Sequence, residues 1–315
     1  MNQENTDGKT QSVRTSEEYE SLNQHPHNLP SALAQVDLAG HSHRGHIRNN
    51  NEDHYLAVRM TRSLETLLTN LKHDARATRF DETAYAMLVA DGMGGMAAGE
   101  IASSVALMTL MDLVVQTPDW IMRMKERENA AIVMRRMTNR FRQIDDEMRQ
   151  LGESERALRG MGTTLTVTAS LGTDLILSHI GDSRAYLFRN EKLHQLTSDH
   201  TLAQAFIDAG IAGPDDTATR AMRHVLTAAL GSTGVPTDPQ VLRLHLNEGD
   251  QVLLCTDGLS EMVSDEAIAS VLTATDSSTA ACQTLVDLAL DEGGKDNVTV
   301  VLGRYHFPRE SAEKE

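Results

Sequence analysis

The chain has 315 residues, 40% of them apolar, and its 29 Lys and Arg against 45 Asp and Glu leave a net charge of −16. This balance argues against nucleic acid and anionic membranes as partners, because both repel an acidic surface. No apolar run reaches the roughly 20 residues of a membrane span, and the polar N-terminus contains no secretion signal. The only cysteines, Cys255 and Cys282, lie in apolar segments and suit a reducing compartment. We therefore expect a cytoplasmic protein, acting as a monomer.

The ends of the chain differ in composition from the rest. Residues 1–30 are polar and without periodicity, which predicts a disordered N-terminal arm. Residues 307–315 are predicted to be a short charged tail. No linker rich in Pro, Gly or Ser and no internal repeat interrupts residues 31–306, so we expect one domain there.

Short apolar runs alternate with helical patterns along this domain. The runs predict strands at 33–39, 54–59, 84–90, 163–169, 174–180, 183–189, 251–256 and 297–303. The periodic segments predict helices at 98–115, 119–151, 201–210, 218–230, 264–273 and 277–291. The amphipathic segment 61–83 separates two strands and is expected to be an insertion, with a helix at 63–72. Because strands and helices do not alternate regularly, the pattern predicts a layered α+β fold.

Four aspartates stand at the ends of predicted strands, each with glycine close by. They are Asp91, Asp182, Asp257 and Asp296. Each one alone is most simply a turn residue, because Asp next to Gly is common in turns. Strand ends on neighbouring strands lie close in space, however, so four such carboxylates can converge on one site. Carboxylates that gather repel one another unless a cation is present, and oxygen ligands favour Mg²⁺ or Mn²⁺ over zinc.

A polar loop at residues 44–54, with the sequence RGHIRNNNEDH, adds a fifth element. It places Arg48 just before Glu52 and Asp53. These residues can simply form a solvated turn. Beside a metal site, the planar guanidinium of Arg48 can instead hold a phosphate through two parallel hydrogen bonds, while the two acids hold metal-bound waters.

The ordered series of motifs resembles one known family. The motifs are NED (51–53), VADGMGG (89–95), GTT (162–164), IGDSR (180–184), LTSDH (196–200), LCTDGL (254–259) and GGKDNVTVV (293–301). In this order they resemble the metal-dependent protein phosphatase 2C family, in its bacterial form. Members of that family act on phosphoserine and phosphothreonine. The resemblance covers residues from about 35 to 303, nearly the whole predicted domain.

The resemblance implies a four-layer α-β-β-α sandwich, in which two antiparallel sheets pack face to face and helices cover the outside. It also implies two Mn²⁺ or Mg²⁺ ions at one edge of the sandwich. By motif, Asp91 resembles the carboxylate that bridges both ions, and Gly92 resembles a backbone carbonyl ligand of the first. Asp257 and Asp296 are similar to ligands of the second ion.

Further positions carry over by motif. Glu52 resembles the residue that contacts the metals through water, with Asp53 supporting it, and Arg48 resembles the arginine that binds phosphate. Asp182, together with Asp257, resembles a third, weakly bound metal site of bacterial members. Glu261 stands where some members have Asp, so the resemblance leaves its role open.

The chemistry implied is in-line attack on phosphorus by a water that two divalent ions activate, without a phosphoenzyme. Eukaryotic members carry a histidine where this chain has Met93, so the leaving group must be protonated in another way. Residues 198–240 are expected to form a flap beside the site, with His200 as a structural residue at its start. The implied partners are phosphorylated proteins and a cognate serine/threonine kinase. Two alternatives are a catalytically silent binding domain, which would be expected to lose metal carboxylates, and a hydrolase of small phosphate esters.

Overall fold

The computed structural model describes residues 34–68, 79–94, 98–116, 127–213, 216–231 and 238–307. The predicted arm at 1–30 lies outside these ranges. The strands are β1 Gln35–His43, β2 Asp53–Glu65, β3 Arg79–Met93, β4 Gly162–Thr163, β5 Leu165–Leu171, β6 Asp174–Ile180, β7 Arg184–Arg189, β8 Lys192–Gln195, β9 Gln240–His245, β10 Gln251–Cys255 and β11 Val298–His306. The helices are α2 Ala98–Gln116, α3 Arg127–Ser154, the 3₁₀ turn η4 Arg156–Leu158, α4 Leu202–Asp208, α5 Thr217–Ala221, α6 Asp257–Ser260, α7 Asp265–Ala274 and α8 Ser278–Asp291.

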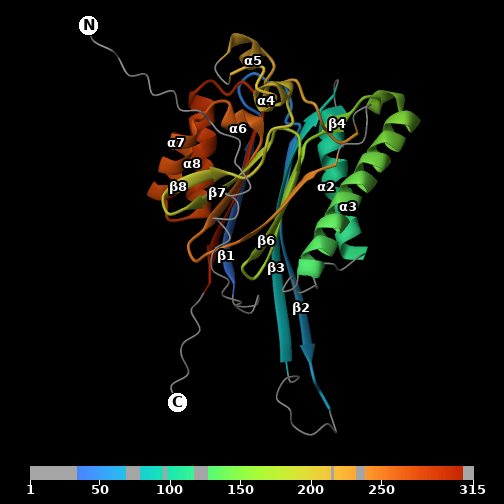
Figure 1. The fold of residues 1–315 in the computed structure, drawn as a ribbon, viewed down its shortest axis with the longest axis vertical. Helices are drawn as coiled ribbons and strands as arrows, with labels where there is room; N and C mark the ends of the chain where they lie inside the picture. Colours follow the sequence, from blue (N-terminus) through green and yellow to red (C-terminus); the bar gives the residue numbers. More distant parts are fainter. Residues whose placement is uncertain are drawn as a thin grey trace.

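The strands form two sheets that lie face to face (Figure 1). Sheet A has the order β1-β11-β10-β7-β8, and sheet B has the order β2-β3-β5-β6-β9, with β4 paired to β3. Neighbouring strands in both sheets run antiparallel. Because β1 pairs with β11, the predicted domain at 31–306 begins and ends in the same sheet.

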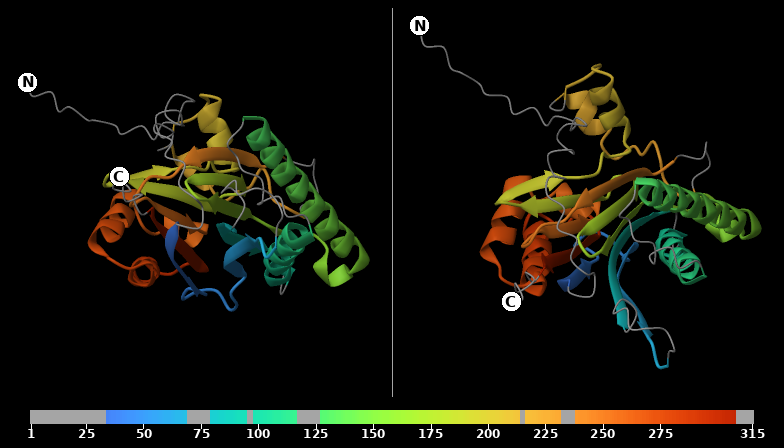
Figure 2. Two further views of the ribbon diagram at one scale, coloured as in Figure 1. Left: turned by 90° about the horizontal axis from the view of Figure 1, so that it is seen from below. Right: turned by 60° about the horizontal axis from the view of Figure 1, so that its bottom comes forward.

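Successive side chains along each strand point to opposite faces of its sheet, and this alternation creates the layers. On β3, Leu88 and Ala90 join the apolar cluster beneath α2 and α3, whereas Met87 and Val89 point to the opposite face and pack between the two sheets. On β10, Cys255 likewise joins the cluster beneath α7 and α8. Three apolar clusters therefore separate four layers, and Figure 2 shows the helices on both outer sides. The predicted α+β sandwich of two antiparallel sheets is confirmed.

The outer helices are held by their apolar faces and by their caps. Ser264 and Ser277 cap α7 and α8 by accepting hydrogen bonds from backbone N–H groups in the first turn. Among the described helices, only α2 is long and apolar enough to cross a membrane by length and composition. Its buried residues, including Ala102 and Leu110, belong to the cluster that packs on sheet B, as in the core helix of a globular domain.

The helix expected at 63–72 is wrong where the structure describes it, because residues 63–65 belong to β2. Residues 61–65 and 79–83 continue β2 and β3 as a long hairpin, and they are joined in register with Thr61 opposite Thr83. The amphipathic pattern fits either element, and pairing with β3 together with an Arg62–Glu82 ion pair at 2.8 Å stabilises the strand. Residues 69–72 of that expected helix lie outside the described residues.

Other differences concern the flap and the C-terminus. The helix expected at 218–230 ends after Ala221, because the apolar residues that follow make backbone bridges instead, Leu226 to Thr201 and Leu230 to Thr163. The expected helix at 119–151 is described only as α3, from Arg127 onward. Strands β8 and β9 were not predicted.

The predicted tail begins one residue too early. Phe307 is buried and stacks on Tyr305, with ring centroids 6.2 Å apart. Its backbone N–H also donates to Glu248. Phe307 therefore belongs to the folded domain, and residues 308–315 lie outside the described residues.

Candidate active site

The four predicted aspartates meet at one edge of the sandwich. Asp91 lies near the end of β3, Asp182 follows β6, Asp257 opens α6 directly after β10, and Asp296 precedes β11. The charges of Asp182, Asp257 and Asp296 all act on the carboxyl of Asp91. The convergence that the sequence predicts is therefore present in the structure.

Asp53 joins this group from the neighbouring strand. It stands directly opposite Asp91 in the β2–β3 ladder. Its Oδ2 accepts a 2.8 Å hydrogen bond from the hydroxyl of Thr256, and that hydroxyl accepts from the backbone N–H of Thr299 at 3.0 Å. This chain of bonds ties β2 of sheet B to β10 and β11 of sheet A at the site.

Burial and mutual repulsion disfavour ionisation of these acids. Burial raises the pKa of Asp91 well above its usual range, and the charges of Asp53 and Asp257 raise it further. Burial, followed by the charge of Asp257, raises the pKa of Asp182 to about 8. Burial and the charge of Glu261 raise the pKa of Asp257 to about 6. A site with this many neighbouring carboxyl groups is stabilised by a cation.

Gly92 is required by a close approach of two backbones. A Cβ at Gly92 would lie 2.0 Å from the carbonyl oxygen of Gly99 at the start of α2. The backbone N–H of Gly92 donates to the carbonyl of Glu52 at 3.2 Å. The site therefore brings the backbone of residue 92 close to that of Glu52.

Arg48 reaches the same edge from the 44–51 loop. Its Nη2 donates to Asp296 Oδ2 at 2.5 Å, and its side chain is 52% exposed. Asn297 fixes the loop, because its amide donates to the carbonyls of Arg44 and Asn50 while its Oδ1 accepts from the N–H of Glu52. The guanidinium thus lies beside the carboxylates and is open to solvent.

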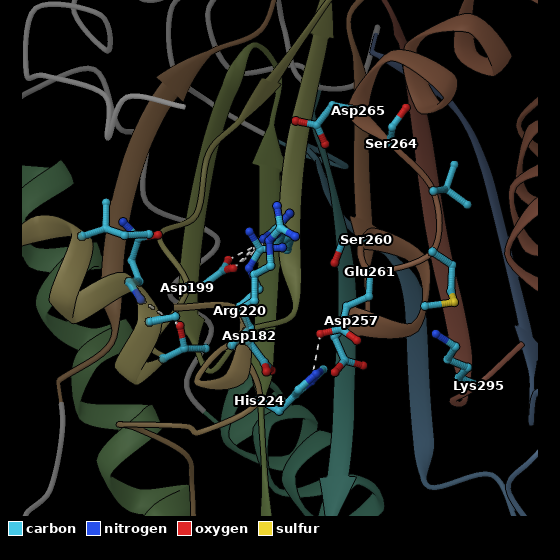
Figure 3. A pocket seen from close by; sticks show the side chains of 18 of the residues that line it. Asp182, Asp199, Arg220, His224, Asp257, Ser260, Glu261, Ser264, Asp265 and Lys295 are labelled. Carbon is cyan, nitrogen blue, oxygen red and sulfur yellow. Dashed lines mark hydrogen bonds and ion pairs between the residues drawn. The ribbon is translucent and has the colours of Figure 1, made fainter. Parts of the chain in front are cut away.

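Within the segment expected to form a flap, helices α4 and α5 stand beside the site (Figure 1). A pocket of about 860 Å³ lies between these helices and the α6–α7 region, and Figure 3 shows Asp182, Asp257, Glu261 and His224 gathered at one part of it. His200 is buried in part, stacks on His179 at 5.0 Å, and its Nδ1 accepts from the N–H of Gly181. His200 therefore has the structural role expected of it.

The donor set suits hard divalent ions. Asp53 Oδ1 and Asp257 Oδ1 are buried without a hydrogen-bond partner, which leaves two carboxylate oxygens for a ligand. The neighbouring donors are also oxygens, from Asp91, Asp296 and the backbone at Gly92. Oxygen ligands with several carboxylates are what Mg²⁺ and Mn²⁺ require, so the residues present fit the metal pair that the motifs imply.

Comparison with known proteins agrees with this geometry. The model of the family described as "Protein phosphatase 2C" matches residues 70–291. The chain belongs to the protein phosphatase 2C family. Protein phosphatase PhpP of Streptococcus pneumoniae is 36% identical over 224 residues, which span 69% of this chain and 84% of PhpP. The serine/threonine protein phosphatase PstP of Mycobacterium tuberculosis is 35% identical over 275 residues, which span 86% of this chain and 46% of PstP. The chain thus spans about half the length of PstP.

Solved structures of protein phosphatase 2C relatives have the same fold. The crystal structure of M. tuberculosis PstP superimposes with a TM-score of 0.68 at 32% identity, covering 86% of this chain and 99% of that one. The PstP catalytic domain in complex with two manganese ions gives a TM-score of 0.66 at 33% identity, with coverage of 87% and 99%.

Several supporting residues of this protein phosphatase 2C domain were not singled out from the sequence. Thr256 and Thr299 hold Asp53, and Thr164 donates or accepts with Ser183 at 2.8 Å, next to Asp182. These four residues all lie inside the quoted motifs GTT, IGDSR, LCTDGL and GGKDNVTVV, so the sequence signal was their position near the aspartates in those motifs. His224 lies in no motif, and nothing in the sequence marks it.

Proposed function

We propose that this chain is a metal-dependent serine/threonine protein phosphatase that hydrolyses phosphoserine and phosphothreonine in proteins. The observation that carries the proposal is the convergence of Asp91, Asp182, Asp257 and Asp296 at one sheet edge, with Arg48 beside them. The family supports the same activity, because its named bacterial members above are serine/threonine or protein phosphatases. A silent binding domain is disfavoured, since every carboxylate implied for the metal pair is present.

The metal pair would be held by Asp91, the carbonyl of Gly92, Asp257 and Asp296, with Glu52 acting through water. When bound, two Mn²⁺ or Mg²⁺ ions lower the pKa of a water and neutralise charge on the phosphoryl group. Asp182 would contribute to a weaker third site, together with Asp257. Asp53 would support the site from the neighbouring strand, where Thr256 holds its Oδ2 and its Oδ1 is left free.

Arg48 positions the substrate. Its planar guanidinium can donate two parallel hydrogen bonds to non-bridging phosphoryl oxygens, where negative charge shifts during hydrolysis. Its present partner is Asp296, so substrate binding exchanges a carboxylate for a phosphate within the same cluster. The loop bonds of Asn297 keep Arg48 on the correct side of the site.

The proposal extends to a partner kinase, argued from the substrate class, and to a cytoplasmic location, argued from the cysteines. A phosphatase of phosphoserine and phosphothreonine reverses serine/threonine kinases, so we include a cognate kinase in the proposal. Cys255 and Cys282 are free and buried, which suits a reducing cytoplasm. We also propose that the protein acts as a monomer and without nucleic acid or membrane.

The deciding test is hydrolysis of a phosphothreonine peptide with Mn²⁺, with and without EDTA. We expect activity that chelation abolishes, and we expect Asp257→Asn or Asp296→Asn to lower kcat by at least about 10²-fold, since each removes an anionic metal ligand. Full activity in EDTA would contradict the proposal. Efficient hydrolysis of p-nitrophenyl phosphate with no gain on phosphopeptides would instead favour a small phosphate ester as the substrate.

A further inference from the structure

The start of α2 lies against two of the groups proposed to bind the metal pair. A Cβ at Gly99 would lie 2.8 Å from both Cδ and Oε2 of Glu52, and 2.9 Å from the carbonyl oxygen of Gly92. These distances are too short for a real side chain, so only glycine lets the helix come this close. Asn50 donates to the other carboxylate oxygen of Glu52, Oε1, at 3.2 Å. The helix is therefore the wall behind the Glu52 carboxylate and the Gly92 carbonyl.

Ser103 fastens this helix to Glu52. Its side chain is fully buried, and its Oγ donates to the carbonyl oxygen of Glu52 at 2.6 Å. The same carbonyl accepts the backbone N–H of Gly92 at 3.2 Å. One carbonyl oxygen therefore joins α2, the residue before β2 and the end of β3, directly behind the metal-binding edge.

His54 orients this hydroxyl. Its Nδ1 lies 2.9 Å from Ser103 Oγ, and the carbonyl oxygens of Gly99 and Glu100 lie 3.2 Å from the same atom. A serine hydroxyl has one proton to donate, and a carbonyl can only accept. We assign that proton to the shortest of these bonds, the one to Glu52. The Oγ then accepts from His54, which carries its proton on Nδ1.

This support lies on the opposite face of sheet B from the converging aspartates. Asp53 faces sheet A, where Thr256 holds it, and the next residue, His54, faces α2. Asp91 stands opposite Asp53 and shares its face of the sheet. Ser103 and His54 therefore act from behind the strands, through Glu52, and not by touching the reacting atoms.

We propose that Ser103, oriented by His54, is a positioning residue for one ion of the metal pair, because it holds α2 against Glu52 and the Gly92 carbonyl. The inference rests on the proposed function, which takes these two groups as metal-binding groups. Both need a fixed position, since one acts through water and the other is an uncharged carbonyl. The second ion should not depend on Ser103, because its proposed ligands Asp257 and Asp296 stand at the ends of sheet A strands.

The neighbouring serine is a matched control. Ser104 follows Ser103 on α2, and its hydroxyl lies on the exposed side, 3.8 Å from the sulfur of Met108. Replacing either serine with alanine removes the same atom from the same helix. Of the two, only Ser103 bonds to Glu52. A difference between the two variants therefore reports on that bond and not on the helix in general.

The test is Mn²⁺ binding to the metal-free full chain by isothermal titration calorimetry, without substrate. We expect Ser103→Ala to weaken one of two ions by about 10- to 100-fold, the effect of losing a residue behind a metal ligand. The other ion should bind as in wild type, and Ser104→Ala should match wild type at both. Equal weakening of both ions in Ser103→Ala, or the same weakening in Ser104→Ala, would overturn the proposal.

Two further outcomes separate this proposal from the proposed function. Wild type that binds no Mn²⁺ would overturn the proposed metal pair, and this inference with it. Two ions that Ser103→Ala binds as tightly as wild type would overturn this inference alone.

His54 supplies a second pair of variants, which leave Ser103 in place. Asparagine has an amide N–H that can replace the Nδ1 donor, whereas leucine has no donor in its side chain. We expect His54→Leu to weaken the same ion as Ser103→Ala, and His54→Asn to recover most of that affinity. Equal Mn²⁺ affinities in the two His54 variants would overturn the proposal.

Kinetics distinguish positioning of an ion from general support of the fold. Saturating Mn²⁺ should restore kcat of Ser103→Ala on a phosphothreonine peptide, with KM unchanged, because mass action compensates for a weakened site. Melting temperatures of the metal-free proteins measure any purely structural loss. A kcat that stays low at saturating Mn²⁺, with an unshifted Mn²⁺ dependence, would show that Ser103 supports only the fold and would overturn the proposal.

Discussion

Arg48 lies 2.5 Å from Asp296 and is half exposed, so its guanidinium can turn to a substrate without breaking any buried contact. We expect Arg48→Ala to lower kcat/KM for a phosphopeptide by roughly 10²-fold, with a higher KM and a lower kcat. Arg48→Lys should recover only part of this, because a point charge does not supply two parallel hydrogen bonds. Steady-state kinetics of the two variants checks this, and an unchanged kcat/KM in Arg48→Ala would remove Arg48 from the site.

His179 makes the free energy of unfolding depend on pH, separately from the carboxylates of the metal site. It is fully buried, and burial together with the nearby His200 lowers its pKa to about 3. An unfolded histidine has a pKa of about 6.5, so below that pH the unfolded chain binds a proton that the folded chain does not. The stability that neutral His179 allows is therefore fully present above pH 6.5 and is lost as pH falls toward 3.

His179→Asn tests this directly. We expect the free energy of unfolding of wild type to gain a slope of up to about 1.4 kcal/mol per pH unit below pH 6.5 from this one residue. The variant should lack that slope, whatever its stability at pH 7.5. Urea titrations between pH 5 and 7.5 measure both slopes, and the difference between them isolates His179. Parallel curves for the two proteins would show that His179 titrates normally in the folded state.

The β2–β3 hairpin extends beyond its sheet. The other neighbour of β3, β5, pairs with it only from Ala84 to Val89, so from Thr83 outward β3 has β2 as its sole sheet partner. Figure 1 shows this ribbon projecting away from both sheets. A two-stranded ribbon contributes little stability by itself.

The ribbon can therefore be shortened. Ser63 stands directly opposite Asp81, so an Asn-Gly pair in place of residues 64–80 would close the hairpin with a two-residue turn. We expect the melting temperature to change by less than about 4 °C, which is roughly 1 kcal/mol for a domain of this size, and hydrolysis of a short phosphopeptide to be unchanged. Thermal unfolding and peptide kinetics check this. A larger loss of stability would mean that the ribbon is part of the core.

Elements with one dominant pattern were predicted well from the sequence. β6 and α8 match the expected 174–180 and 277–291 almost to the residue, because each has a clear apolar period and, for α8, a serine cap. The predicted secondary structure was wrong where contacts with distant segments determine the conformation. The VLTAAL run at 225–230 reads as a helix, yet its backbone bonds to Thr201 and Thr163.

In the site, too, features with a local sequence pattern could be predicted, and contacts between distant segments could not. Its aspartates can be found from the sequence because each stands at the end of a predicted strand with a glycine close by, which is a local signal. The contact of His224 with Glu261 joins two segments that no local pattern connects. Distances of this kind arise from the packing of the flap and are not encoded in spacing along the chain.

For the molecule as a whole, the acidic edge predicts that metal stabilises the fold. The ions bind the folded state, in which Asp91, Asp257 and Asp296 converge, and not the dispersed acids of the unfolded chain. At 100 times its dissociation constant, one ion adds about 2.7 kcal/mol, which corresponds to roughly 5–10 °C in melting temperature. Differential scanning calorimetry across Mn²⁺ concentrations checks this, with Asp257→Asn as the variant expected to respond less. A melting temperature independent of Mn²⁺ would contradict it.

The order of sheet A has a consequence for how the protein is made. β11 lies between β1 and β10, and it joins residues as distant as Gln35 and His306. During synthesis β1 is made first in this sheet but cannot pair with β11 until β11 has been made. Its edge therefore stays unpaired while most of the domain emerges from the ribosome. Such long-range pairing also slows folding. Asp296 and Asn297, which complete the site, are made only just before β11, so the nascent domain acquires its acidic edge only when its last strand is made.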